Sequence, residues 1–114
     1  MISKTNPLYI KADSLAKSIY TITRSFPKDE SYGITSQIRR AVLSIILNII
    51  EGFARQSPAE YRRFLIISYG SLKETSYLID FAHEQRYLNH DTRDKLLLLT
   101  EELGKILWSI IHKS

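Results

Sequence analysis

The feature that most constrains this chain is an uncharged stretch at residues 41–50, in which Ser44 and Asn48 are the only polar residues. A helix on the outside of a small bundle should show water a polar face, yet this segment carries no charge for about three turns. It therefore needs cover nearly all round, and 114 residues offer little cover. The stretch predicts self-association. Four of its apolar residues form the predicted oligomer interface: Leu43, Ile46, Leu47 and Ile50.

The composition indicates one domain over residues 1–114, with 44% apolar residues to build a modest core. The chain has no cysteine, which excludes disulfides and thiolate metal sites and suits the cytoplasm. Its first residues lack the apolar core and cleavage site of a secretory signal. The uncharged stretch is also shorter than the ~20 residues that cross a bilayer. We therefore expect a cytoplasmic protein that does not enter a membrane.

Apolar residues recur at helical spacing in four segments, which predicts helices over about residues 7–25, 35–55, 58–86 and 90–112. Asn6, Ser57 and Asn89 stand where helix N-caps are expected, and Ser57 with Glu60 forms the pattern of a capping box. The connections are short and no segment alternates like a strand. The prediction is an all-α, up-down-up-down antiparallel four-helix bundle. Three glycines inside these helices indicate close helix approach: Gly52, Gly70 and Gly104.

Polar residues at spacings of four, four and three predict a seam along the second helix: Arg40, Ser44, Asn48 and Glu51. Hydrogen bonds between helices explain such a seam better than a small polar site does. In an antiparallel pair joined near residue 57, residue numbers that sum to roughly 114 face each other. This register predicts that Arg40 meets Glu74 of the third helix, and that Glu51 meets Arg62 or Arg63.

The sequence shows no pattern of catalytic chemistry. Its three histidines, His83, His90 and His112, are scattered, without a second ligand type at zinc spacing. There is no glycine-rich phosphate loop and no serine in a nucleophile elbow. We therefore expect no cofactor, no metal and no enzymatic activity.

The formal charge of +4 permits nucleic acid as a partner but is also ordinary for a soluble surface. Arg55, Arg62 and Arg63 flank one predicted turn, and Arg39 lies near the opposite end of the bundle. These four arginines are the candidate nucleic-acid-binding residues, with two tyrosines in predicted turns, Tyr32 and Tyr87, free to stack on bases. The alternative interpretation is a solvated basic rim, neutralised by nearby glutamates.

Several segments resemble a known family: residues 26–41, Asn48, Glu51-Gly52, Glu60-Tyr61, Phe64-Leu65, Gly70-Ser71 and Glu74. They are similar to the bacterial four-helix-bundle proteins encoded in intervening sequences of 23S ribosomal RNA. Family members commonly carry Pro, Ser and Ala where this chain has Ile46, Leu47 and Ile50, so this helix is more apolar and lacks a proline kink. The resemblance implies a homopentameric ring of bundles.

A related family member, the accessory protein of diversity-generating retroelements, binds nucleic acid and a reverse transcriptase through a basic surface. Two hypotheses follow for this chain. In the first, a homo-oligomer binds structured RNA, other nucleic acid or a nucleic-acid-bound protein. In the second, the homo-oligomer is an adaptor between proteins and touches no nucleic acid.

Overall fold

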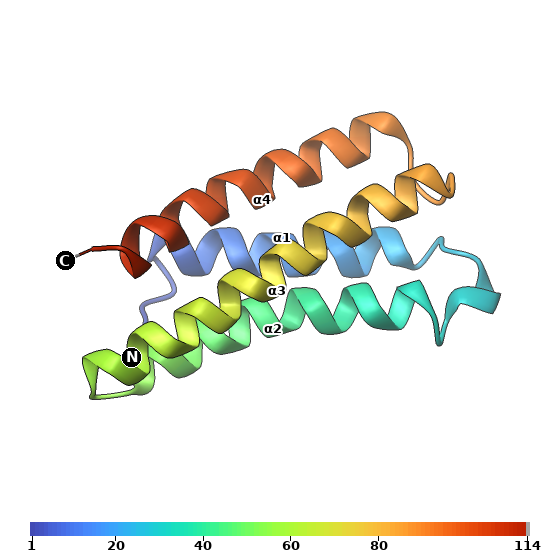
Figure 1. The fold of residues 1–114 in the computed structure, drawn as a ribbon. Coiled ribbons are helices and arrows are strands. Elements are labelled where there is room, and N and C mark those ends of the chain that lie inside the picture. The colour runs from blue at the N-terminus through green and yellow to red at the C-terminus, as the bar shows by residue number, and fades with distance from the viewer. Residues whose placement is uncertain (114) are drawn as a thin grey trace.

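The computed structural model describes residues 1–113 and confirms the predicted all-α four-helix bundle (Figure 1). The α-helices begin and end within two residues of the predicted positions: α1 Pro7–Thr23, α2 Ile34–Ala54, α3 Pro58–Glu84 and α4 His90–Ile111. A short 3₁₀ helix, η1 Lys28–Glu30, lies in the segment expected to be a polar loop. No strand occurs in the described residues. Successive helices run in alternate directions in Figure 1, and both chain ends lie beside the α2–α3 turn.

The predicted N-caps explain where three helices begin. The Asn6 side chain accepts a hydrogen bond from the Leu8 amide at 2.9 Å, and the Asn89 side chain accepts one from the Thr92 amide at 2.8 Å. Ser57 accepts from the Glu60 amide at 3.4 Å. The second half of the expected capping box differs, because the Glu60 carboxylate accepts a hydrogen bond from Arg63.

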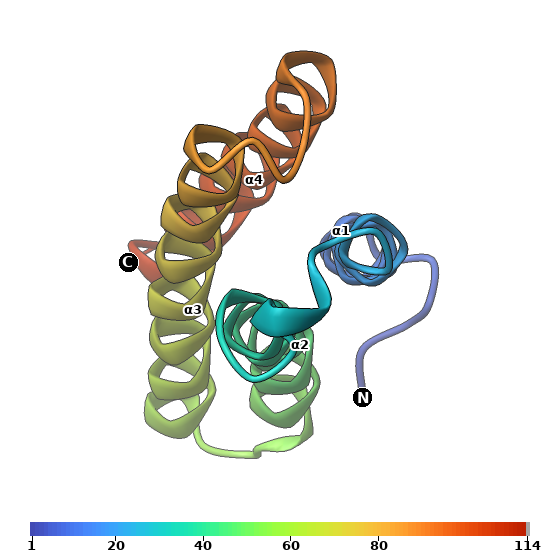
Figure 2. The same cartoon turned by 90° about the vertical axis from the view of Figure 1, so that its right-hand side faces the viewer.

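The core is centred on α2, which lies between α1 and α3 when the bundle is viewed end-on (Figure 2). Its inward stripe is buried at Ile38, Val42, Ile45 and Ile49, because these residues recur at the helical period on one face. Fully buried side chains from the other helices complete this core: Leu8, Leu15, Ile19, Leu65, Leu72, Ile79, Leu103 and Leu107. Burying this apolar surface is the main term that stabilises the bundle.

The prediction of close helix approach is correct at Gly52 and Gly104 and wrong at Gly70. A Cβ atom at Gly52 would lie 3.2 Å from the Tyr61 carbonyl oxygen and 3.2 Å from the Phe64 Cβ, both on α3. A Cβ atom at Gly104 would lie 3.3 Å from Leu72 Cδ2. Gly70 has nothing within 4 Å of its Cβ position, because it lies on the exposed face of α3.

A second, smaller apolar cluster lies at the end of the bundle away from the chain ends, where Phe26, Ile34 and Ala82 are buried together. Tyr87 packs against Phe26 with ring centroids 5.5 Å apart, and its hydroxyl donates to Glu30 at 2.7 Å. This hydrogen bond raises the pKa of the Tyr87 phenol. Tyr87 was expected to be free to stack on bases, and that expectation is wrong because this packing engages its ring.

Candidate functional site

The polar seam between α2 and α3 is a chain of hydrogen bonds. The hydroxyls of Ser44 and Ser71 lie 2.7 Å apart, and the Asn48 amide donates to the Ser44 carbonyl at 2.7 Å and to its hydroxyl at 3.0 Å. Ser68, which is fully buried, donates to the Ile45 carbonyl at 2.8 Å. The two serine hydroxyls and the Asn48 amide N–H groups in the middle of the seam are therefore paired with one another or with the backbone, which favours a structural role for the seam over a ligand site.

The predicted ion pairs across α2 and α3 are wrong. Within residues 1–113, no ion pair joins Arg40 to Glu74, or Glu51 to Arg62 or Arg63. The register itself agrees with the turn arithmetic, as the Ser44–Ser71 and Ser68–Ile45 hydrogen bonds show. Arg40, Glu51 and Glu74 are exposed, and Glu51 pairs instead with Arg55, four residues further along the chain.

Two of the four candidate nucleic-acid-binding arginines are neutralised locally. Arg55 pairs with Glu51 at 2.6 Å, and Arg63 pairs with Glu60 at 2.9 Å. The hydrogen bond from Arg63 lowers the pKa of the Glu60 carboxyl and raises that of Arg63. Both guanidinium groups also lie over the Phe64 ring, 4.7 and 4.6 Å from its centroid. Little net charge remains on this part of the surface.

The other two candidate arginines differ from each other. Arg39 joins α2 to α1: its Nε donates to the Thr23 hydroxyl at 2.8 Å, and its guanidinium lies 4.6 Å from the centre of the Tyr20 ring. These contacts make it a structural residue. Arg62 is exposed, and its Nε donates to the Ile111 carbonyl at 2.9 Å. No carboxylate in residues 1–113 pairs with Arg62, so its charge is available at the surface.

The four residues expected at an oligomer interface divide between core and surface. Leu43 and Leu47 are 36% and 57% exposed. Ile46 is only 7% exposed and belongs to the core, while Ile50 is half-buried against it. The expectation that Ile46 lies on a free surface is therefore wrong. The Ile46 side chain points about 100° round the helix from that of Leu47, toward the side of α2 where Arg39 contacts α1.

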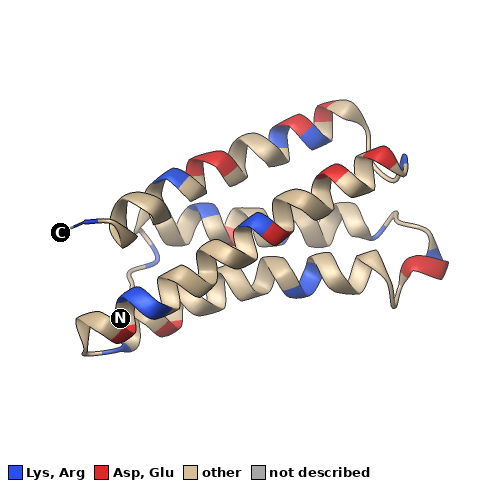
Figure 3. Ribbon diagram, viewed as in Figure 1, with Lys and Arg blue, Asp and Glu red and all other residues tan. Residues whose placement is uncertain are grey.

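Leu43 and Leu47 border a surface that crosses from α2 to α3, named here the α2–α3 face. It has three rows at i, i+4 spacing: Leu43 with Leu47, Ser44 with Asn48, and Ile67 with Ser71. The Ser44–Ser71 hydrogen bond holds the second row beside the third. Ile67 is 40% exposed. Along α2 the ribbon is without charge from Arg40 to Glu51 (Figure 3).

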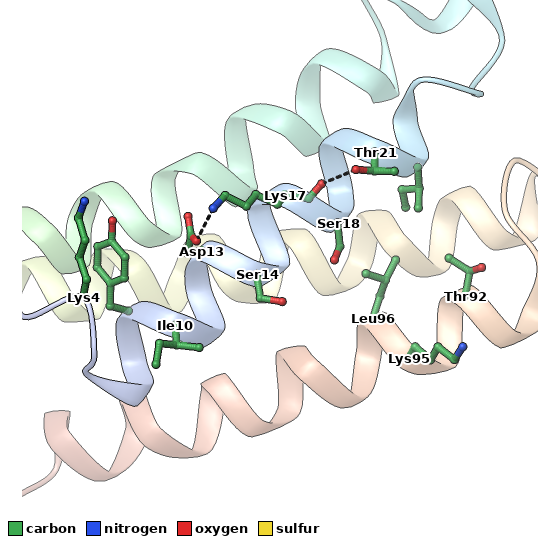
Figure 4. A pocket seen from close by; sticks show the side chains of 12 residues that line it. Lys4, Ile10, Asp13, Ser14, Lys17, Ser18, Thr21, Thr92, Lys95 and Leu96 are labelled. Atoms are coloured by element: carbon green, nitrogen blue, oxygen red, sulfur yellow. Dashed lines mark hydrogen bonds and ion pairs between the residues drawn. The ribbon is translucent and has the colours of Figure 1, made fainter.

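An open groove of about 780 Å³ lies between α1 and α4 (Figure 4). Hydroxyl groups from both helices line it, among them Ser14, Ser18 and Thr92. Its basic residues include Lys17, which pairs with Asp13 at 2.8 Å. That partner raises the pKa of Lys17. The groove lacks the arrangement of nucleophile, base and oxyanion donors that acyl-transfer sites share.

Sequence reasoning missed a cluster of aromatic and basic residues between α3 and α4, named here the α3–α4 groove. The Tyr69 and Trp108 rings lie 5.5 Å apart, and Trp108 stacks on His112 at 3.7 Å. Basic residues flank the rings: Arg62, Lys73 and Lys105. A signal was present, because residues 62, 66, 69 and 73 share one face of a helix, as do 101, 105, 108 and 112. Of the two tyrosines expected to stack on bases, Tyr32 is fully exposed, but it lies in a turn outside this groove.

The described residues show neither a candidate metal site nor a helix that could span a membrane. No group of three or more histidine, aspartate or glutamate side chains in residues 1–113 could hold a metal ion. None of the described helices is both long enough and apolar enough to cross a bilayer.

Comparison with known proteins places the chain in a family. The sequence model of the 23S rRNA-intervening sequence proteins matches residues 4–109. A crystal structure from Bacteroides thetaiotaomicron, described as a protein with unknown function from the S23 ribosomal protein family, is similar with a TM-score of 0.84 and 25% sequence identity. The match covers 93% of this chain and 99% of that one. No curated protein matches the chain. The match over residues 4–109 shows that this protein belongs to the 23S rRNA-intervening sequence protein family.

Proposed function

We propose that this protein is a non-enzymatic module that works as a homo-oligomer whose copies meet through the α2–α3 face. The observation that carries the proposal is the pair of exposed leucines, Leu43 and Leu47, on a helix surface with no charge between Arg40 and Glu51. Contiguous apolar surface of this kind on a small domain is typical of a protein–protein contact.

The composition of this face favours a second copy of the chain as its occupant. Its middle row consists of Ser44 and Asn48, whose hydroxyl and amide N–H groups are already hydrogen-bonded, so covering them costs few bonds to water. Charges stand at both margins, Arg40 with Glu74 at one and Glu51 with Arg63 at the other. Both signs at each margin suit a partner with the same surface. The ring of five that the family resemblance implies is part of this proposal.

Light scattering during gel filtration tests the proposal. We expect the wild-type protein to elute at micromolar concentration with a mass that is a multiple of 13.2 kDa. Leu47→Glu should shift the mass toward that of the single chain, because an unpaired charge in a packed interface is strongly unfavourable.

Leu98→Glu on α4 is the matched control, since Leu98 and Leu47 are both 57% exposed. This variant should leave the mass unchanged. A wild-type mass of 13.2 kDa, or equal dissociation by both variants, would contradict the proposal.

Nucleic-acid binding is a second candidate function, favoured by the exposed Arg62 guanidinium without a carboxylate partner in residues 1–113. An oligomer would repeat this charge, and fields from several copies add. A gel-shift assay with ribosomal RNA fragments at two salt concentrations tests it, because phosphate binding weakens steeply with salt.

Arg62→Ala and Arg63→Ala form a matched pair for this assay. Arg62→Ala should reduce the slope of log affinity against log salt by about one unit for each phosphate that the variant no longer binds. Arg63→Ala should change it less, because Glu60 already neutralises Arg63. Absence of any shift by the wild-type protein at low salt would favour the adaptor hypothesis.

A further inference from the structure

We infer that the α3–α4 groove binds single-stranded nucleic acid, with an unpaired base stacked at the Tyr69–Trp108 pair and phosphates held by Arg62, Lys73 and Lys105. This inference rests on the nucleic-acid candidate above and assigns it a surface and a class of ligand.

The aromatic pair is built to receive a flat group. Trp108 is 52% exposed although its ring centre lies 5.5 Å from that of Tyr69 and its ring stacks on His112 at 3.7 Å. The His112 ring is held in place because its Nδ1 lies 3.0 Å from the Trp108 carbonyl oxygen, to which it donates. Because two neighbouring side chains hold this exposed ring in place, binding a ligand does not cost the side-chain conformational entropy of ordering it.

Two hollows open beside the rings, and both are lined by Tyr69 and Trp108. One holds about 300 Å³ and has Gly104 in its lining. The other holds about 200 Å³ and is lined by Arg62, Ile66 and His112. Pockets for drug-sized ligands run from about 300 to 1,000 Å³. Two small adjacent hollows therefore suit consecutive small flat groups better than one large ligand.

The charges of the groove select an anionic ligand. Arg62, Lys73 and Lys105 line the two hollows against one carboxylate, Glu101. Within residues 1–113 none of these three cations forms an ion pair. The Lys73 ammonium lies over the Tyr69 ring, 5.2 Å from its centre, which places a positive charge directly beside the aromatic pair.

Flat rings interleaved with cations along one groove match the alternation of base and phosphate in a nucleic-acid strand. Stacking on aromatic side chains with a basic track for the backbone is how proteins bind single strands without reading sequence. A duplex hides its base faces inside the stack, so it cannot use the aromatic pair. A single strand or the loop of a folded RNA is therefore the ligand that the groove fits.

Trp108 is the only tryptophan in the chain, so its fluorescence reports on this groove alone. We expect an oligouridylate of about 12 nucleotides to quench it at low salt, and a duplex of the same length to leave it nearly unchanged. Affinity is then measured by the anisotropy of a labelled oligouridylate. Trp108→Leu should weaken binding about 5- to 150-fold, the range for loss of one stacked base, whereas Trp108→Phe should retain most of it.

Tyr77→Leu is the control, because Tyr77 is an aromatic residue of α3 that is 65% exposed and lines neither hollow, and it should bind like the wild type. If Trp108→Leu binds like the wild type, or if the duplex binds as tightly without quenching, the groove is not the site, although nucleic-acid binding stands. If neither probe nor ribosomal RNA fragments bind the wild type at low salt, both this inference and the nucleic-acid candidate are overturned.

Discussion

Helix α3 contacts its two neighbours through different side chains, although a glycine allows close approach in each contact, Gly52 toward α2 and Gly104 toward α4. Toward α2 it presents Ser68 and Ser71, which hydrogen-bond across the contact at 2.8 and 2.7 Å, opposite the segment where Gly52 allows close approach. Toward α4 it presents Tyr69, whose ring lies 5.5 Å from that of Trp108. Small residues let two helix backbones touch, whereas bulky rings fill the outer edge unevenly and leave hollows of about 300 and 200 Å³.

This difference indicates that the two sides of α3 have different roles. The contact with α2 leaves a face whose hydroxyl and amide N–H groups are already hydrogen-bonded, which suits burial against another copy. The open contact with α4 leaves aromatic rings and cations in water, which suits a ligand that arrives and departs. If so, substitutions in the α2–α3 contact should lower the free energy of unfolding, and substitutions in the α3–α4 groove should not.

Gly52→Val should have the largest effect on stability. Its Cβ would lie 3.2 Å from the Tyr61 carbonyl oxygen, a backbone atom that cannot move aside, so we expect a loss of about 1–3 kcal/mol. Gly70→Val is the matched change, because nothing lies within 4 Å of that Cβ; it should be neutral or slightly stabilising, since glycine is a poor helix former. Urea unfolding at one fixed protein concentration measures both. Equal losses would show that α2 and α3 are not in close contact at Gly52.

Ser68→Ala should come next, with a loss of about 1 kcal/mol. Ser68 is fully buried and donates across the contact to the Ile45 carbonyl. Ser76→Ala is the control, because the Ser76 hydroxyl bonds only to Leu72 within its own helix, and we expect a change of a few tenths of a kcal/mol there. Thermal or urea unfolding resolves the two. A Ser68→Ala protein as stable as the wild type would mean that the seam adds no stability.

Trp108→Leu should cost less than about 1 kcal/mol of stability, because half of the tryptophan surface is already in water. The same variant loses binding if the groove takes a single strand, so stability and binding should separate. The midpoint of urea unfolding is the measurement. A loss near the ~3 kcal/mol typical of a core tryptophan would reassign Trp108 to structure and weaken the comparison between the two contacts.

The smallest effect should be the pH dependence of the Glu60–Arg63 pair beside the α2–α3 turn. Arg63 lowers the Glu60 pKa in the folded state, so the stabilisation is fully present above the unfolded pKa of about 4.3 and is lost as pH falls through the lower folded value. Glu60→Gln should therefore differ from the wild type at neutral pH and converge with it in acid. A constant difference at every pH would contradict the pairing.

The helices were predictable because their signals are local. Asn6, Ser57 and Asn89 accept hydrogen bonds from amides two or three residues ahead, and the inward stripe of α2 follows from helical period alone. The α2–α3 register was predictable for the same reason, since a short turn leaves little freedom in how two helices align. The predicted positions within these helices were therefore close to those observed.

The side-chain contacts between helices were predicted less well. The prediction placed the members of the pairs Arg40–Glu74 and Glu51–Arg63 at matching heights along the two helices, but their side chains do not meet. An exposed side chain takes the nearest partner, and for Glu51 that partner is Arg55. Gly70 had the same signature as Gly52, yet it faces solvent. The height of a residue along the helix axis is set by residue count. The direction of its side chain depends on how each helix rotates about its own axis to bury its apolar stripe.

The sequence by itself determined the four helices, their ends, the buried stripe of α2 and the presence of an uncharged surface around Leu47. Only the tertiary structure decided which of those apolar residues remain in water, burying Ile46 and leaving Leu43 and Leu47 exposed. It also brought Tyr69 and Trp108 together from separate helices. The physical reason is range: capping and periodicity act over a few residues, whereas a groove arises only when packing sets the rotation and spacing of helices against one another.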